Sequence, residues 1–194
     1  MPPKVRITRD DILNASMELT RLGGTQLLNA RTIAAHLGCS TQPIFSNFAT
    51  MEQLTQAVLE QAKTLYEEYT RREIESGQYP DYKASGMAYI RFAREEKEFF
   101  KLLFMCDRCG EDIPEDDELN GRMESYVQQN TGLTGMDVKL FHLEVWAFVH
   151  GIATMFATGF LDLPWDLVSK MLTDAFQGLR KQYESEGSHG SHSN

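Results

Sequence analysis

The stretch RTIAAHLGCSTQPIFSNFATMEQL, from Arg31 to Leu54, predicts two short helices joined by a tight turn and followed by a longer helix. In the first helix, Ile33, Ala34 and Leu37 fall on one face at helical spacing. Gly38 comes directly after them, and glycine commonly ends a helix because it tolerates a positive φ. We therefore expect the first helix to end in a turn at Gly38.

The second helix is expected to be short, with Ser40 as its cap and Pro43 in its first turn, where no intrahelical N–H is required. Its buried side is predicted to carry three large apolar residues: Ile44, Phe45 and Phe48. Three polar residues are left to point outwards: Thr41, Gln42 and Ser46. A capping box from Thr50 to Gln53 then predicts the start of the third helix. Two helices around a short glycine-containing turn, the second polar outside, are typical of a helix-turn-helix.

The spacing A-x-x-x-G-C-S-x-x-x-I-F-x-N-F-x-x-M-x-x-L, from Ala34 to Leu54, resembles the helix-turn-helix of the TetR/AcrR transcriptional regulators. The usual letters in that family are A-x-x-x-G-V-S-x-x-x-L-Y-x-H-F-x-x-K-x-x-L. The Tyr, His and Lys of the pattern generally touch phosphates, and Phe45, Asn47 and Met51 stand at those positions here. The resemblance implies an all-α regulator with a DNA-binding head of three helices, the first of them over residues 9–22, and a helical body.

In this setting the second helix of the helix-turn-helix faces DNA, where a glutamine such as Gln42 suits adenine in a bidentate contact. Phe45 is expected to pack, with contact to a thymine methyl as the alternative. Phosphate contacts are expected at the start of the preceding helix and from Asn47. The N-terminal arm could reach phosphate or a minor groove, or it could be solvated without contact. The predicted DNA-binding set is Lys4, Arg6, Arg31, Thr32, Thr41, Gln42, Ser46 and Asn47.

Charge is divided unevenly along the chain of 194 residues, whose net charge is −9. Residues 1–50 carry five basic and three acidic side chains, so the acidic excess belongs to the remainder of the chain. An acidic body would repel a phosphate backbone, so only the N-terminal part is expected to face DNA.

The rest of the chain alternates helical patterns with breaks. A capping box at Thr8 and Asp11 predicts the start of the first helix, whose apolar stripe is Ile12, Ala15, Leu19 and Leu22. The domains are expected to be a head over residues 1–50, a ligand-binding and dimerisation body over residues 51–184, and a disordered tail over residues 185–194. Helices in the body are expected over residues 51–76 and 81–95, from about Pro114 to residue 130, over residues 136–159, and from Pro164 onwards. The apolar run from Phe99 to Met105 is expected inside the body.

The last two helices are apolar over more of their circumference than one core contact requires. We therefore expect a homodimer in which each copy contributes this pair to a four-helix bundle. Thr134 and Asp137 predict a capped start for the first helix of the pair. Its Trp146-x-x-x-His150-Gly151 pattern resembles one TetR subgroup.

The resemblance implies a ligand cavity inside the body, where aromatic and methionine side chains suit apolar ligands. Most such side chains belong to the hydrophobic core, so the ones that line a cavity are chosen here by their position in the sequence. The predicted cavity set is Met87, Phe92, Phe100, Phe104, Met123, Tyr126, Phe141 and Trp146. His142 and His150 are expected to be packed and hydrogen-bonded, with a role as polar handles for the ligand as the alternative.

Other functions are disfavoured by what the sequence lacks. There is no run of 18 apolar residues and no signal peptide, so we expect a cytoplasmic protein without a membrane span. Cys106-x-x-Cys109 has no second ligand pair near it, so no metal or cofactor is expected, and incidental thiols are favoured over a redox sensor. No nucleophile–base pairing or phosphate loop is recognisable, so we expect no enzymatic activity.

The sequence therefore predicts a homodimeric transcriptional regulator, a repressor that binds a palindromic operator and is released by a small-molecule effector. The alternative is a dimeric small-molecule-binding or protein-interaction module whose DNA binding is weakened. Phe45, Asn47, Met51 and the mildly basic head motivate that alternative.

Overall fold

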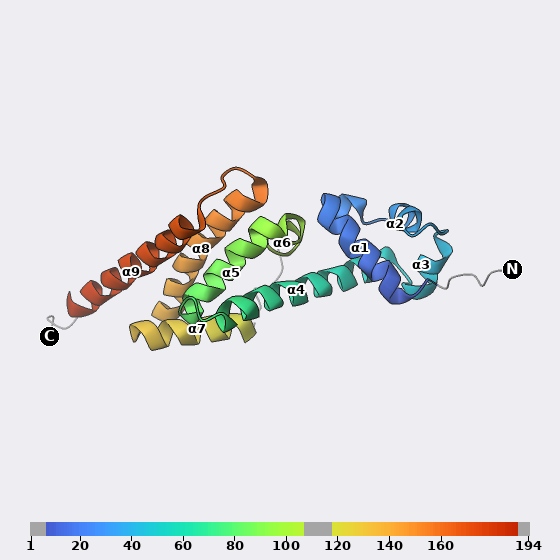
Figure 1. The fold of residues 1–194 in the computed structure, drawn as a ribbon. Helices are drawn as coiled ribbons and strands as arrows, with labels where there is room; N and C mark the ends of the chain where they lie inside the picture. Colours follow the sequence, from blue (N-terminus) through green and yellow to red (C-terminus); the bar gives the residue numbers. More distant parts are fainter. Residues whose placement is uncertain (1–6, 107–117, 190–194) are drawn as a thin grey trace. The chain divides into compact units, whose positions relative to one another are not determined.

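A computed structural model describes residues 7–106 and 118–189, and the regular structure in these ranges is entirely helical (Figure 1). The prediction of an all-α fold is confirmed. A short 3₁₀ helix, Gly24–Leu27, which the sequence analysis did not anticipate, joins the first two helices. The α-helices are α1 (Arg9–Gly23), α2 (Ala30–His36), α3 (Gln42–Asn47), α4 (Met51–Glu75), α5 (Asp81–Glu95), α6 (Lys97–Phe104), α7 (Glu118–Thr131), α8 (Met136–Thr158) and α9 (Trp165–His189).

The chain forms two compact units. The first unit comprises Met1–Glu68 and Glu95–Asp107, and the second comprises Tyr69–Arg94 and Arg108–Asn194. Helix α6 is part of the first unit and packs against α1. The apolar run that forms α6 is buried through Phe99, Phe100 and Leu103, and it belongs to the first unit, whereas the sequence had placed it in the body. Hydrophobicity predicts that such a run is buried, without saying which core it joins.

The first unit begins with the predicted capping box. The Thr8 hydroxyl accepts the Asp11 N–H at 3.1 Å, and the Asp11 carboxylate accepts the Thr8 N–H at 2.8 Å. Leu22 was expected in the apolar stripe of α1 but is 75% exposed, because the helix ends at Gly23 and the chain turns away. The core of this unit comprises Ile12, Ala15, Leu19, Ile33, Ala34, Ile44, Phe48, Leu54 and Ala57.

The helix-turn-helix is present, with two differences at its caps. Gly38 has the expected positive φ, 64°, after α2. Ser40 was expected to cap α3, but α3 begins one residue later than that cap implies, and Thr41 occupies the N-cap position without a side-chain hydrogen bond. At the start of α4, the Thr50 hydroxyl accepts the Gln53 N–H at 3.3 Å, as predicted. The Gln53 amide oxygen accepts the N–H of Ala49 at 3.0 Å, one residue before the expected donor.

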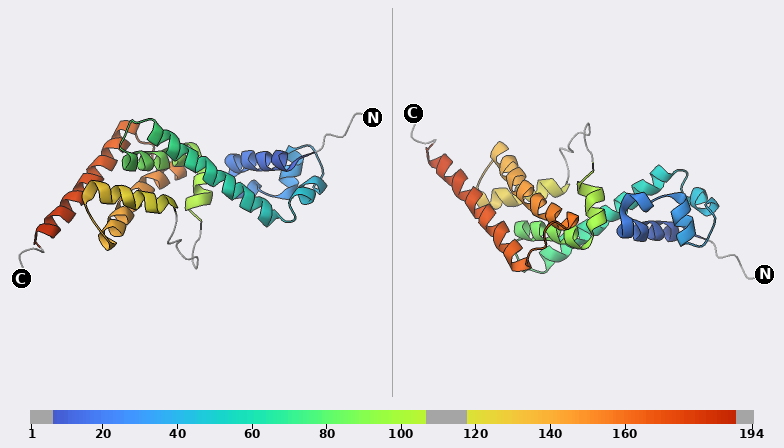
Figure 2. Two further views of the ribbon diagram at one scale, coloured as in Figure 1. Left: turned by 90° about the horizontal axis from the view of Figure 1, so that it is seen from below. Right: turned by 90° about the horizontal axis from the view of Figure 1, so that it is seen from above.

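The second unit places α5, α8 and α9 side by side (Figures 1 and 2). Helix α5 has the predicted bounds, Asp81–Glu95. Lys83 on α5 reaches α9, where its ammonium donates to the hydroxyls of Ser169 and Thr173, each at 2.8 Å. The core of this unit includes Met87, Ile90, Phe92, Val127, Phe141, Ile152, Ala153 and Val168.

Two boundaries in the second unit differ from the expectation. Gly135 takes the N-cap position of α8 with φ 62° and no side-chain hydrogen bond, so the predicted cap involving Thr134 and Asp137 was wrong. Helix α9 continues to His189, so residues 185–189 are not the disordered tail that the sequence predicts. A polar composition does not prevent a helix, which is why composition alone misplaces this boundary. The remaining tail, residues 190–194, and the predicted helix start near Pro114 lie outside the described residues.

Candidate functional site

Helix α3 is anchored on one side and presents a mixed polar and aromatic face on the other. Ile44 is fully buried and Phe48, just past the helix end, is 1% exposed. Phe45 was expected to be buried with them but is 50% exposed. Successive residues of a helix are about 100° apart, so α3 can turn Ile44 towards the core and Phe45 towards solvent. Gln42, Phe45 and Ser46 are therefore the exposed residues of α3.

The polar side chains of α3 are not equally available to a partner. The Ser46 hydroxyl donates to the Gln42 carbonyl at 2.9 Å, and the Asn47 amide donates to the Pro43 carbonyl at 2.8 Å. The Gln42 amide makes no side-chain hydrogen bond within residues 7–106 and 118–189. Gln42 is thus the α3 side chain whose donors and acceptor are all open to a ligand.

The start of α2 supplies the other predicted contacts. Asn29, which the sequence analysis did not single out, caps α2 by accepting from both the backbone N–H and the hydroxyl of Thr32, each at 3.0 Å. Arg31, next to Thr32, is exposed. The predicted arm residues Lys4 and Arg6 lie outside the described residues. The structure thus brings the other predicted DNA-binding residues together in the first unit, on α2 and α3.

Helices α1 and α6 are linked by charged and aromatic contacts inside the first unit. Arg21 donates two hydrogen bonds to the Glu96 carboxylate, at 2.7 and 3.1 Å, and its guanidinium lies 5.2 Å from the ring centroid of Phe99. Gly24 has φ 70°, and a Cβ added there would lie 2.7 Å from the Glu98 carboxylate. These contacts connect the supporting helix of the helix-turn-helix to α6.

Two tyrosine–histidine pairs join α5 to α8 in the second unit. The Tyr82 hydroxyl lies 3.0 Å from His142 Nδ1, and the Tyr89 hydroxyl lies 2.9 Å from His150 Nδ1. Burial lowers the pKa of both histidines and raises that of Tyr82. The expectation that both histidines are packed and hydrogen-bonded is confirmed. Sequence reasoning missed the tyrosines, because nothing local relates residues some 60 positions apart.

The predicted cavity residues are divided between the two units. Phe100 and Phe104 belong to the first unit and the other six belong to the second. Within the second unit, Met87, Phe92 and Phe141 are fully buried, Met123 is 6% exposed and Trp146 is 42% exposed. Trp146 stacks on His150 with ring centroids 4.9 Å apart. Which of these residues touch a ligand stays a prediction.

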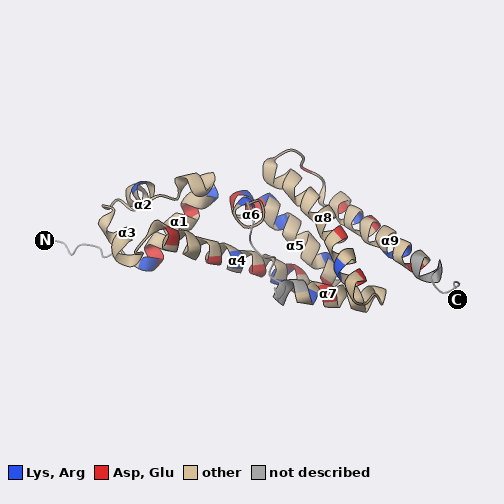
Figure 3. Ribbon diagram, turned by 180° about the vertical axis from the view of Figure 1, so that it is seen from behind, with Lys and Arg blue, Asp and Glu red and all other residues tan. Residues whose placement is uncertain are grey.

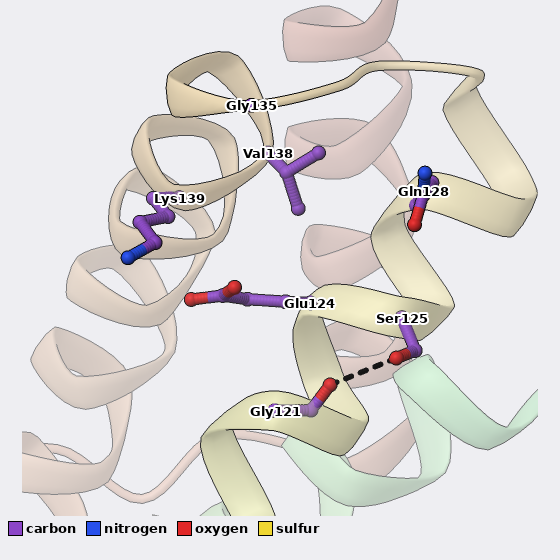
Figure 4. Close-up of a pocket in the computed structure, with 7 residues that line it drawn as sticks. All are labelled: Gly121, Glu124, Ser125, Gln128, Gly135, Val138 and Lys139. Atoms are coloured by element: carbon purple, nitrogen blue, oxygen red, sulfur yellow. Dashed lines mark hydrogen bonds between the residues drawn. The ribbon is translucent and has the colours of Figure 1, made fainter. Parts of the chain in front are cut away.

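A pocket of about 330 Å³ opens between α7 and α8 instead, and its walls are mainly polar (Figure 4). Glu124 and Lys139 face it from the two helices, and Val138 is the buried residue of its lining. None of the predicted cavity residues lines this pocket. A search for aromatic and methionine side chains could not have found it. The lining comprises Gly121, Glu124, Ser125, Gln128, Gly135, Val138 and Lys139.

An ion pair with a buried carboxylate is a further polar feature that sequence reasoning missed. Glu73 is 8% exposed, and one of its carboxylate oxygens accepts from Arg91 at 3.0 Å. The Arg91 guanidinium lies 4.4 Å from the ring centroid of Trp165. The other Glu73 oxygen, Oε1, and Trp165 Nε1 are buried without a hydrogen-bond partner in the described residues. Buried polar atoms are usually paired, so this acceptor and donor are open to water or to a ligand.

Within the described ranges no group of three or more His, Cys, Asp or Glu side chains could hold a metal ion. Cys106 is exposed, whereas Cys109 lies outside those ranges, so a role for the Cys106-x-x-Cys109 motif stays untested. Among the described residues, α8 is the helix whose length and composition would allow it to cross a membrane. Its most apolar 18-residue stretch has a mean hydropathy of 1.4. The sequence criterion of an unbroken apolar run overlooked it. A core helix of a soluble protein meets the same test, so this is weak evidence for a membrane span.

Comparisons with known proteins agree with this architecture. Residues 82–176 match the family described as tetracyclin repressor-like, C-terminal domain. The structure of a TetR-like transcriptional regulator from Rhodococcus sp. RHA1 aligns over 92% of this chain and 98% of its own, with 16% sequence identity and a TM-score of 0.66. A TetR family member from Streptomyces coelicolor aligns over 86% of this chain and 96% of its own, with 14% identity and a TM-score of 0.55. A search of curated proteins finds no match.

A helix-turn-helix unit followed by a helical unit of this kind defines a transcriptional regulator. The family match lies mostly in the second unit, whereas the motif from Ala34 to Leu54 lies in the first, so the two observations are independent. The chain belongs to the TetR family of transcriptional regulators. Members of this family bind DNA, form dimers in general and are not enzymes.

Proposed function

We propose that the protein is a homodimeric repressor that binds a palindromic operator and is released from it by a small molecule. The observation that carries the DNA-binding part is the exposed face of α3, which leaves the Gln42 amide open beside the Phe45 ring. A recognition helix enters the major groove, where a glutamine amide can pair with the edge of adenine. Arg31, exposed at the start of α2, supplies a cation for the phosphate backbone.

Dimerisation is supported by the outward face of α8. An exposed stripe with helical spacing runs along it: Met136, Leu140, Leu143, Ala147, Gly151 and Met155. From Val145 to Thr158 the helix carries no Lys, Arg, Asp or Glu (Figure 3). Large exposed apolar patches usually mark an interface, and a two-fold axis places the same stripe of a second copy against this one. The small residues Ala147 and Gly151 would permit a close approach of the two helices.

The two-fold axis of such a dimer implies an operator with two inverted half-sites. An effector that binds the second unit would act only through different affinities for the DNA-binding and released states. Helix α4 runs from the first unit into the second, and α6 follows directly after α5, so each of these connections offers a covalent route for that signal. The open polar atoms of Glu73 and Trp165 are candidate contacts for the effector.

The alternative, a small-molecule-binding dimer with weakened DNA binding, is favoured by one observation. The Asn47 amide donates one hydrogen bond to the Pro43 carbonyl, and Phe45 has no hydrogen-bonding group, so these two positions, which contact phosphates in the family, offer fewer donors here. The two functions predict different behaviour on DNA.

Selection of bound duplexes from a random pool separates these functions. The repressor should enrich an inverted repeat, and the Gln42→Ala variant should enrich it less or relax its sequence. Leu22→Ala, which changes an exposed residue of α1, is the matched control and should enrich the same repeat as the wild type. Recovery of unrelated sequences by the wild type at low salt would favour the alternative.

A further inference from the structure

Phe45 is an apolar residue at the centre of a surface that should meet a polar groove. Half of its surface is exposed, whereas Ile44 beside it is fully buried. Gln42 and Phe45 are three residues apart on α3, so they are neighbours on the same side of the helix. Exposing an aromatic ring to water is unfavourable in the free protein, because its apolar surface is hydrated and makes no compensating contact. If α3 enters the major groove, the ring beside the open amide of Gln42 also lies against the DNA.

The neighbouring polar groups narrow what α3 can read. Ser46 and Asn47 donate to carbonyls of their own helix. Gln42 is therefore the exposed residue of α3 whose amide keeps all of its donors and its acceptor, whereas the Phe45 ring can neither donate nor accept. The amide can recognise a base edge by hydrogen bonds, whereas the ring can recognise only an apolar group.

The major groove of DNA presents one apolar group of this kind, the C5 methyl of thymine. We propose that Phe45 contacts a thymine methyl in each operator half-site, next to the base pair that Gln42 reads, and thereby makes the protein selective for thymine at that position. This inference rests on the proposed function, because it requires that α3 enters the major groove. It adds a specificity contact that does not depend on phosphate binding.

Replacement of single thymines by deoxyuridine tests the contact directly. Deoxyuridine keeps the base pair and the O4 acceptor and lacks only the methyl group. On the selected operator, substitution at the contacted thymine in both half-sites should weaken wild-type binding by about 4-fold per half-site, the effect of burying one methyl-sized group. Substitution at the other thymines should change the affinity little. Fluorescence anisotropy at constant salt measures both.

The Phe45→Ala variant makes the test specific to this side chain. It should bind the thymine operator more weakly than the wild type and should bind the thymine and deoxyuridine operators equally. Leu22→Ala, which alters another exposed apolar residue of the first unit, should keep the wild-type discrimination. Circular dichroism should show unchanged helix content in both variants, because neither side chain is buried.

The possible failures are distinguishable. If the wild type binds a specific operator but no deoxyuridine substitution weakens it, the methyl contact is refuted and the proposed function stands. If Phe45→Ala retains the full deoxyuridine effect, another residue makes the contact and the inference is overturned. If no specific duplex can be selected at all, the proposed function fails and the inference fails with it.

Discussion

Replacing Gly24 by alanine should destabilise the protein through its backbone. Gly24 has φ 70° and ψ −167°, a conformation that is essentially restricted to glycine and costs other residues of order 1–3 kcal/mol. The new Cβ would lie 2.7 Å from Glu98 Oε2. That carboxylate can rotate away, at the expense of its half-exposed ion pair with Lys101 at 2.6 Å, which contributes under about 1 kcal/mol. We expect the free energy of unfolding to fall by about 2–3 kcal/mol.

Urea unfolding of the full chain, followed by circular dichroism, measures this loss. The matched control is Gly121→Ala, because Gly121 lies within α7 and a Cβ there meets nothing within 4 Å. That variant should be neutral or more stable by up to about 1 kcal/mol, since alanine favours a helix. A Gly24→Ala variant within about 0.5 kcal/mol of the wild type would refute the strain argument, since it would mean that the backbone relaxes there at little cost.

Three further predictions follow from the same contacts. A double-mutant cycle with Arg21→Ala and Glu96→Gln in urea unfolding should give a coupling energy of about 0.5–1 kcal/mol, because the pair is bidentate but Arg21 is 48% exposed; a coupling near zero would contradict it. Burial lowers the folded-state pKa of His142 from its ordinary value of 6.5, although Glu124 opposes the shift. The folded chain then binds this proton less readily than the unfolded chain, so stability should fall as pH drops below 6.5, and less steeply in His142→Gln. Unfolding midpoints at several pH values measure this slope, and an unchanged slope in the variant would contradict the assignment. Leu143→Glu should raise the concentration at which dimers dissociate by about tenfold or more in light-scattering measurements, whereas Leu22→Glu should not; a dimer unaffected by Leu143→Glu would place the interface elsewhere.

Local sequence features predicted local structure well. The capping box of Thr8 and Asp11, the turn at Gly38 and the bounds of α5 depend on residues within a few positions of one another. Capping, glycine conformations and helical periodicity act over that range. The resemblance of residues 34–54 to the TetR pattern then predicted the all-α architecture that the structure and the family match confirm.

Features that depend on distant contacts were not predictable. Periodicity could not decide whether Phe45 or Ile44 faces the core, because only the packing of α3 selects one side. Hydrophobicity indicated that α6 is buried but not that it packs against α1. The tyrosine partners of His142 and His150 lie on α5, far away in the sequence. The candidate effector contacts were missed for the same reason, since Glu73 and Trp165 meet through Arg91 only in the folded chain.

The most direct test of the central claim is the salt dependence of binding to the selected operator. Fluorescence anisotropy should compare that operator with a scrambled duplex between 50 and about 200 mM salt. We expect tight binding to the operator, a steep loss of affinity with salt and a clear preference over the scrambled duplex. Equal, weak binding to both duplexes even at low salt would contradict the account and would leave the chain a TetR-family protein whose first unit does not read DNA.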